Sequence, residues 1–196
     1  MHSKPDVAPV EKGAPVRQRV LDAAERLLRN GKAGFSMRDL AAEAGVSFAT
    51  PFNQFGSKAG IMHALSGRRI ELMAARYAAA PRTADAAGRV RLAITVAVAV
   101  MLDEPDVNRA VMASIGTAGP ARTDALERST AYWALALHAE DGGMRLQPGS
   151  AGDVPRQLAL AFRGALSFWS AGELSDAELG PAALAIADTL MLALTE

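Results

Sequence analysis

Cysteine is absent from this chain of 196 residues, and histidine occurs only 3 times. The chain therefore cannot form a disulfide framework, a thiolate metal site or a cysteine nucleophile. A glycine-rich phosphate loop of the P-loop or dinucleotide type is also lacking. His138 with Glu140 and Asp141 could be drawn as a metal cluster, but these neighbours do not share one helix face. The sequence predicts no catalytic residue, no metal site, no cofactor and no enzymatic activity.

Long apolar runs are lacking too. The longest, from Leu92 to Leu102, has 11 residues, whereas crossing a bilayer takes about 20. The first 15 residues contain three prolines and no apolar stretch of the length that a secretory signal needs. We interpret residues 1–15 as a flexible basic arm, and we expect a cytoplasmic protein that has no membrane partner.

The zero net charge hides an asymmetry along the chain. Residues 1–80 carry 12 Lys/Arg against 7 Asp/Glu, whereas residues 81–196 carry 9 against 14. A basic segment is typical of a surface that meets a polyanion, because neutralising phosphates releases condensed counterions. Chance scatter of surface charge is the alternative interpretation.

Apolar residues recur with helical periodicity along the chain, and no run alternates as a strand would. The sequence therefore predicts an all-α fold with an N-terminal helix-turn-helix head and a C-terminal helical bundle. The nine helices that it predicts cover residues 16–30, 37–44, 48–54, 58–79, 84–102, 105–115, 120–140, 154–171 and 175–194.

Capping residues define the short second and third helices. Ser36 precedes MRDLAAEA, and Asp39 three residues later completes a carboxylate variant of the capping box. Gly45 ends the second helix, and Ser47 is expected to cap the third. Three short helices in this order predict a helix-turn-helix.

The segment between Arg19 and Leu65 resembles the N-terminal domain of the TetR family of transcriptional regulators. The residues that carry the resemblance are Ala23, Ala24, Leu27, Leu28, Leu40, Ala41, Ala44, Gly45, Val46, Ser47, Thr50, Phe55, Ser57 and Lys58. It implies a DNA-binding domain at residues 16–56 and an effector-binding and dimerisation domain at residues 57–196, with the helix at 57–79 as connector.

The chain departs from the family pattern in its third helix. Pro51 stands where relatives have a large aliphatic residue, so it removes an N–H and disfavours a helical Thr50. We expect a tightened first turn to absorb this. Phe52 replaces a tyrosine whose hydroxyl commonly meets phosphate in relatives.

The resemblance implies a DNA-binding surface, which we expect to consist of Ser36, Arg38, Ser47, Phe48, Ala49, Thr50, Phe52, Asn53, Gln54 and Lys58. Arg38 is the first candidate for reading a base, since guanidinium to guanine is the commonest specific contact. A surface arginine paired with Glu43 is the alternative. Ser36 could equally be a plain helix cap, and Phe48 could pack on the protein.

The C-terminal residues carry few motifs. Methionine and aromatic side chains suit an adaptable apolar pocket, for which the candidates are Met101, Met112, Trp133, Leu137, Phe162 and Phe168. Each of them could instead be ordinary core. The last two helices, which contain Gly164, Ala165 and Gly172, are similar to the family's dimer-forming pair, although packing within one chain is the alternative.

These expectations lead to one functional hypothesis and one rival. The hypothesis is a homodimeric regulator that leaves a pseudo-palindromic double-stranded operator when a small apolar effector binds. The rival is a small-molecule-binding dimer on the same scaffold that has lost specific DNA reading.

Overall fold

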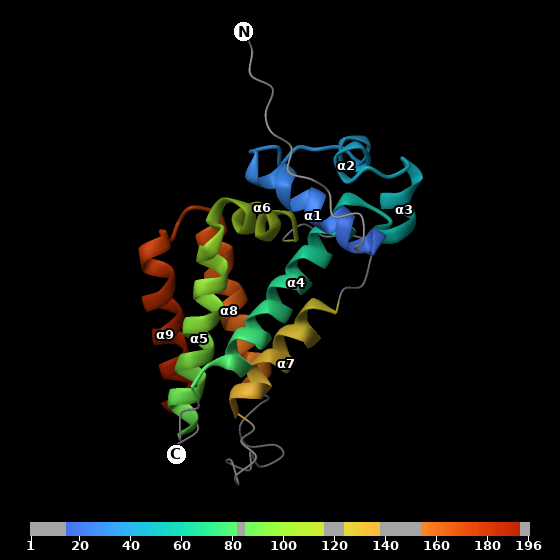
Figure 1. Ribbon diagram of the computed structural model, residues 1–196. Coiled ribbons are helices and arrows are strands. Elements are labelled where there is room, and N and C mark those ends of the chain that lie inside the picture. Colours follow the sequence, from blue (N-terminus) through green and yellow to red (C-terminus); the bar gives the residue numbers. More distant parts are fainter. Residues whose placement is uncertain (1–14, 82–84, 116–123, 138–153, 193–196) are drawn as a thin grey trace. The chain divides into compact units, whose positions relative to one another are not determined.

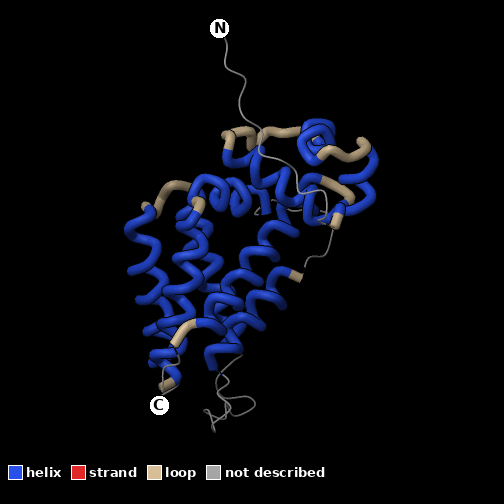
Figure 2. Tube along the Cα trace, viewed as in Figure 1, coloured by secondary structure: helices blue, strands red, loops and turns tan. Residues whose placement is uncertain are grey.

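The structure, a computed structural model, describes residues 15–81, 85–115, 124–137 and 154–192. Within these ranges it contains nine helices and no strand, which confirms the all-α fold class (Figures 1 and 2). No helix in these ranges combines the length and the hydropathy needed to cross a membrane. The chain divides into two compact units, the first ending at Ile61 and the second beginning at Met62.

The first unit contains three short helices and the beginning of a fourth: α1 (Val16–Arg29), α2 (Met37–Ala44), α3 (Ala49–Phe55) and α4 (Lys58–Ala79). The capping box predicted for α2 is confirmed. The Ser36 hydroxyl accepts a hydrogen bond from the Asp39 N–H at 3.2 Å, and the Asp39 carboxylate accepts one from the Ser36 N–H at 2.8 Å. Gly45, at φ 62°, ends α2 in the left-handed conformation that glycine adopts without strain.

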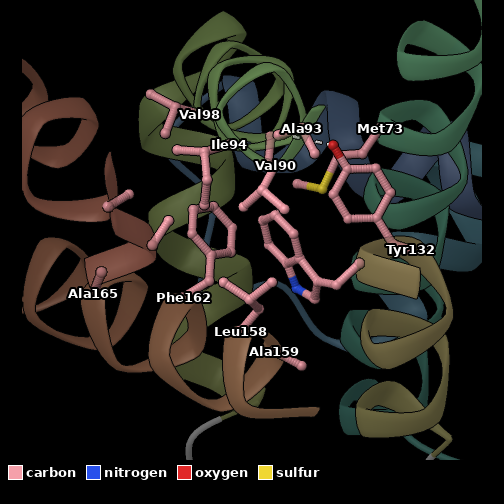
Figure 3. Close-up of a cluster of buried hydrophobic side chains, with 14 of the residues drawn as sticks. Met73, Val90, Ala93, Ile94, Val98, Tyr132, Leu158, Ala159, Phe162 and Ala165 are labelled. Atoms are coloured by element: carbon pink, nitrogen blue, oxygen red, sulfur yellow. Dashed lines mark hydrogen bonds between the residues drawn. The ribbon is translucent and has the colours of Figure 1, made fainter. Parts of the chain in front are cut away.

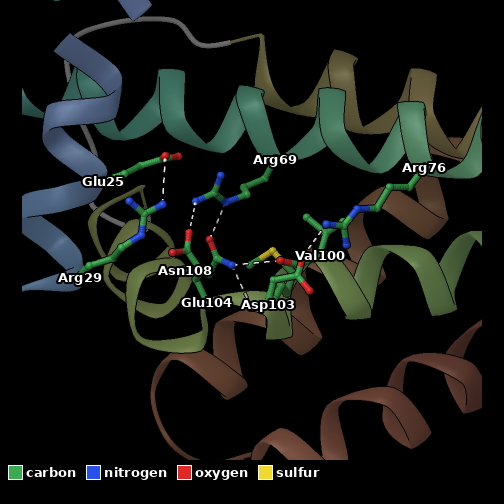
Figure 4. Close-up of polar contacts among 9 residues, drawn as sticks. Glu25, Arg29, Arg69, Arg76, Val100, Asp103, Glu104 and Asn108 are labelled. Atoms are coloured by element: carbon green, nitrogen blue, oxygen red, sulfur yellow. Dashed lines mark hydrogen bonds and ion pairs between the residues drawn. The ribbon is translucent and has the colours of Figure 1, made fainter. Parts of the chain in front are cut away.

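The core of the first unit lies where α1 packs against α2 and α2 against α3. Its buried apolar residues are Val20, Leu21, Ala23, Ala24, Leu27, Leu28, Phe35, Leu40, Ala41, Ala44 and Ile61. Glu25 is charged but only 7% exposed, because Leu21 and Leu28 lie one turn away on the same side. Its carboxylate lies 3.6 Å from the Arg29 guanidinium (Figure 4).

The second unit contains most of α4 and five further helices: α5 (Ala86–Asp103), α6 (Pro105–Ile115), α7 (Ala125–Leu137), α8 (Val154–Ser170) and α9 (Asp176–Leu192). α8 packs against α6, α7 and α9, and α5 packs against α7 and α9. Between them lies one large apolar cluster that includes Val90, Ile94, Tyr132, Leu158 and Phe162 (Figure 3). The cluster contains residues of these five helices and Met73 of α4.

A buried polar network joins α4 to α5 and α6 inside the second unit (Figure 4). Arg69 Nε donates to Asn108 Oδ1 at 2.8 Å, and Arg69 Nη2 lies 3.5 Å from Glu104 Oε2. The Asn108 amide donates in turn to the carbonyls of Val100 at 3.2 Å and Met101 at 2.9 Å. Asn108 is 1% exposed, so its partners replace the water that these groups would otherwise bind.

The helix limits agree with the sequence prediction except at a few ends. α5 begins at Ala86, two residues later than predicted, because the Asp85 side chain caps it by accepting from the Gly88 N–H at 2.6 Å. α3 begins at Ala49 instead of Phe48. The outer ends predicted for the helices at 120–140 and 175–194 lie outside the described residues, as do the arm at 1–14 and His138 with its acidic neighbours.

Candidate nucleic-acid interface and ligand cavity

Pro51 is accommodated by the tightened first turn that the sequence predicts. Because Pro51 has no N–H, the Ser47 carbonyl accepts from the Thr50 N–H instead, at 2.9 Å. Thr50 lies within α3, so the expectation that it is pushed towards an extended conformation is wrong. The Pro51 ring is buried, and its position in the first turn leaves the rest of α3 intact.

Ser47 does not cap α3 with its side chain, which corrects the sequence prediction. Its hydroxyl lies 2.8 Å from the Thr50 hydroxyl, so the two side chains bond each other. Phe48 occupies the N-cap position instead, and its backbone is already helical at φ −53° and ψ −36°. A Ser47 cap would place the first residue of α3 at Phe48. Because the Ser47 carbonyl belongs to the tight turn, α3 begins one residue later, at Ala49.

The solvent side of α3 carries an aromatic pair. Phe48 is 54% exposed and Phe52 41% exposed, and their rings meet edge to face with centroids 5.5 Å apart. Ala49, Asn53 and Gln54 are also exposed around them. The two rings form an exposed apolar pair on this side of α3. The sequence indicated each phenylalanine but not their pairing.

Arg38 of α2 stands beside this pair. Its guanidinium lies 5.7 Å from the Phe48 ring centroid in a cation–π arrangement, and its side chain is exposed. The alternative pairing with Glu43 does not occur, because Glu43 Oε1 accepts from Arg26 Nε at 2.7 Å. The guanidinium thus keeps its hydrogen-bonding edge available.

Two predicted phosphate contacts are already engaged within the first unit. The Lys58 ammonium donates to the carbonyls of Ala33 at 2.5 Å and Phe35 at 3.0 Å, and it lies 4.3 Å from the Phe35 ring centroid. Burial lowers the pKa of this ammonium. The Ser36 hydroxyl donates to the Asp39 carboxylate at 2.8 Å, and hydrogen bonds from Ser36 lower the pKa of that carboxyl. Lys58 therefore ties α4 to the α1–α2 loop.

Two arginines of α1 fix the ends of the neighbouring helices. Arg17 donates to the Gln54 carbonyl at 3.0 Å and lies 4.3 Å from the Phe55 ring centroid. Arg19 donates to the carbonyls of Ala44 at 3.2 Å and Gly45 at 3.0 Å. Cations at the last carbonyls of α2 and α3 satisfy groups that a helix leaves unpaired. These two arginines hold the helix-turn-helix together.

A cavity of about 290 Å³ lies in the second unit between α4, α5, α6, α7 and α8. Its volume is near the lower end of pockets that hold small ligands, roughly 300–1,000 Å³. The side chains around it are mostly apolar: Ile70, Met73, Met101, Val111, Met112, Ile115, Leu126, Trp133, Ala159, Leu160, Phe162 and Leu166. The cavity thus suits an apolar body with few polar groups.

Four of the six predicted pocket residues, Met101, Met112, Trp133 and Phe162, line this cavity. Leu137 does not, because it is buried in the apolar cluster beyond the cavity wall. Phe168 does not either, because it projects outward from α8 and is 54% exposed.

Sequence reasoning missed the wall that α4 supplies. His63, Ser66, Arg69, Ile70 and Met73 recur along α4 at spacings of three and four residues, so they lie on one helix face. That periodicity could have indicated from the sequence that α4 forms a cavity wall. It was not recognised because this face mixes polar and apolar residues.

The polar groups around the cavity differ in their partners and in their electrostatics. The Tyr132 hydroxyl donates to the Ala93 carbonyl at 2.7 Å, and burial raises the pKa of Tyr132 beyond its ordinary value. Burial lowers the pKa of His63, and the nearby Arg163 lowers it further. Burial also lowers the pKa of Arg163. No cluster of three or more possible metal ligands occurs among the residues that the structure describes.

Comparisons with known proteins agree with this architecture. The family model described as "Bacterial regulatory proteins, tetR family" matches residues 20–65. A TetR transcriptional regulator from Rhodococcus sp. RHA1 is 21% identical, with a TM-score of 0.73 over 89% of this chain and 95% of that one. Thermus thermophilus FadR, a TetR family transcriptional repressor solved in complex with lauroyl-CoA, is 23% identical, with a TM-score of 0.68 over 87% and 92%.

A comparison with curated proteins found no match. The resemblance of the helix-turn-helix segment to the TetR family is confirmed by the family model, and the fold of the chain is the fold of these regulators.

Proposed function

We propose that this chain, a helix-turn-helix protein with the TetR-family fold, is a ligand-responsive repressor that leaves its operator when a small apolar effector fills the cavity. The observation that carries the proposal is α4. Its first turn lies in the helix-turn-helix unit, where Lys58 holds it to the α1–α2 loop. The same continuous helix then supplies one wall of the cavity, from His63 to Met73.

Within the DNA-binding surface, the residues divide by chemistry. Arg38, Asn53 and Gln54 carry exposed groups that can hydrogen-bond base edges in the major groove. Phe48, Ala49 and Phe52 offer apolar contact to thymine methyl groups. Thr50 and Ser47 offer hydroxyls for phosphate contacts that fix the register of the duplex, whereas Ser36 and Lys58 reach a phosphate only by exchanging the partners that they hold.

The homodimer is proposed to form through α8 and α9. Leu160, Gly164 and Phe168 follow one another at every fourth position of α8, and Leu160 is 48% exposed and Phe168 54%. Residues at this spacing share one face of a helix. On α9, three small exposed residues repeat at the same spacing: Pro181, Ala185 and Thr189. Small side chains beside an apolar ridge let helices of two subunits approach closely.

Release would follow from a change in the balance between two arrangements of the dimer. An effector that fits the cavity better in one arrangement shifts the population towards it, and α4 carries that difference to the helix-turn-helix. The complex of Thermus thermophilus FadR with lauroyl-CoA supports an effector with an apolar part. The dimer then no longer spaces its two heads to match two half-sites about one DNA turn apart.

One observation favours the rival hypothesis of a ligand-binding dimer without specific DNA reading. The Lys58 ammonium and the Ser36 hydroxyl are occupied inside the first unit, and Phe52 lacks a hydroxyl. Fewer phosphate contacts mean weaker binding and a shallower dependence on salt. The rival predicts the same dimer and the same ligand but no enriched DNA sequence.

Selection from a randomised duplex library at about physiological salt tests the proposal. The purified protein is expected to enrich a sequence with two-fold symmetry, whose half-sites lie about 10–10.5 base pairs apart or at multiples of that distance. If no sequence is enriched from a preparation that light scattering shows to be dimeric and free of bound ligand, the rival replaces the proposal.

Arg38→Ala is expected to weaken binding to the selected operator by about 1–3 kcal/mol and to relax the preference at one position of the half-site. The reason is that the guanidinium is exposed and stacks on Phe48 without an ion pair to Glu43. Fluorescence anisotropy against operator and scrambled duplex measures both effects. Lys32→Ala, which also removes one exposed charge from the first unit, serves as the control. Unchanged specificity in Arg38→Ala would remove Arg38 from the reading set.

A further inference from the structure

Three polar groups in the cavity wall lack an ordinary hydrogen-bond partner. Within the described part of the chain, the hydrogen-bond acceptor of the Arg163 guanidinium is the Met112 sulfur, 3.6 Å from Nη1. The indole Nε1 of Trp133 and the Nδ1 of His63 are buried and have no partner among the described residues. All three residues line the same cavity. Unsatisfied buried polar groups are rare in folded proteins, so the two at His63 and Trp133, beside a guanidinium whose acceptor is a thioether sulfur, call for a common explanation.

The charge of the cavity is positive. The residues that line it include two arginines and no aspartate or glutamate. Arg69 is neutralised by Glu104 at 3.5 Å and is hydrogen-bonded to Asn108. Among the residues that the structure describes, Arg163 has no such carboxylate, and a thioether sulfur is only a weak acceptor. An arginine stays charged even where burial opposes it, so the cavity retains one uncompensated cation.

We propose that the effector is an apolar molecule with an anionic head, of the carboxylate class, whose head binds Arg163. The Trp133 indole N–H donates a second hydrogen bond to the same head or to an adjacent oxygen. The apolar part lies among Met101, Met112 and Phe162. An oxyanion is the partner that guanidinium and indole N–H groups bind, since both only donate.

The surroundings favour a single anionic group over a cluster of phosphates inside the cavity. Only one guanidinium is uncompensated, and the remaining lining is largely apolar. The volume of about 290 Å³ also admits a short chain or a small ring system and little more. A thioester carrier would have to keep its bulk outside the cavity, and it offers no free carboxylate to Arg163.

This inference rests on the proposed function, because it names the ligand class of the same cavity, but it is tested without DNA. Isothermal titration of the full chain compares octanoate with 1-octanol, which has the same chain length and no charge. Octanoyl-CoA is the third ligand and distinguishes a free acid from its thioester. Octanoate is expected to bind about 10- to 100-fold more tightly than 1-octanol, as a charge-assisted hydrogen bond implies, and more tightly than octanoyl-CoA, which has no free carboxylate.

Substitutions at Arg163 assign that preference to one side chain. Arg163→Gln is expected to weaken binding of the anionic ligand by about 10- to 100-fold and to leave 1-octanol within about threefold. Arg163→Lys is expected to restore part of the loss, because it keeps the charge but not the two-pronged geometry. Arg156→Gln is the matched control. Arg156 is exposed on the same helix and does not line the cavity.

Two results would overturn the inference. The first is equal affinity of the wild-type chain for octanoate, octanoyl-CoA and 1-octanol, or binding of none of the three. The second is an anion preference that survives Arg163→Gln, whose fold is checked by circular dichroism. Anion binding through Arg163 in a protein that selects no DNA sequence would leave this inference standing and defeat the proposed function. Selection of a palindromic DNA sequence by a protein without anion preference would leave the proposed function standing and defeat this inference.

Discussion

Phe168→Asp is expected to convert the dimer into monomers and to lower operator affinity by about 10²- to 10⁴-fold. The fall is this large because each head alone holds one half-site, and the link between two heads makes the second contact intramolecular. Phe168 is the largest exposed apolar side chain of the α8 face, at 54% exposure. A carboxylate there would be buried without a partner in a dimer, which is costly.

Sedimentation velocity and anisotropy on the selected operator measure the two effects together. Leu135→Asp is the control, since Leu135 is 48% exposed on α7, away from the α8 and α9 face. That variant is expected to remain dimeric with unchanged operator affinity. A dimeric Phe168→Asp protein that binds the operator normally would show that the dimer uses another surface.

Asn108→Leu is expected to lower the free energy of unfolding by about 2–4 kcal/mol. The change leaves Arg69 Nε and the carbonyls of Val100 and Met101 without their present partner in a buried region. Each buried group left unsatisfied costs about 1–3 kcal/mol, and Glu104 at 3.5 Å from Arg69 limits the total. The hydrogen bonds that are lost lie where α4, α5 and α6 meet, beside the cavity (Figure 4).

Urea denaturation at one fixed protein concentration measures this, because the stability of a dimer depends on concentration. Asp106→Ala lies on the same helix with a side chain that is 97% exposed, and it is expected to change stability by about 0.5 kcal/mol or less. A loss below about 1 kcal/mol for Asn108→Leu would mean that water or side-chain rearrangement replaces the network.

Local signals in the sequence were enough to predict the helices. Periodicity and end residues such as Ser36 with Asp39, or Gly45, act over a few residues, so they were readable and the structure agrees with them. The prediction was wrong where two local effects compete. At Ser47 the expected side-chain cap is replaced by the backbone hydrogen bond from the Thr50 N–H to the Ser47 carbonyl.

The candidate site was predictable only in part, because its contacts join distant segments. All ten residues of the predicted DNA-binding surface are exposed or half-buried, as contact residues must be. The Lys58 bonds to the α1–α2 loop and the Phe48–Phe52 pair depend on the packed structure. Arg163 carries no sequence motif, and its unbalanced charge appears only when the cavity is assembled around it.

The coupling between cavity and operator tests the central claim most directly. Operator affinity is measured by anisotropy with and without a saturating amount of octanoate or 1-octanol, whichever binds more tightly, and ligand affinity is measured with and without operator. Linkage requires both affinities to fall by the same factor, which we expect to be about 5- to 150-fold. A ligand that fills the cavity while both affinities stay unchanged would contradict the account.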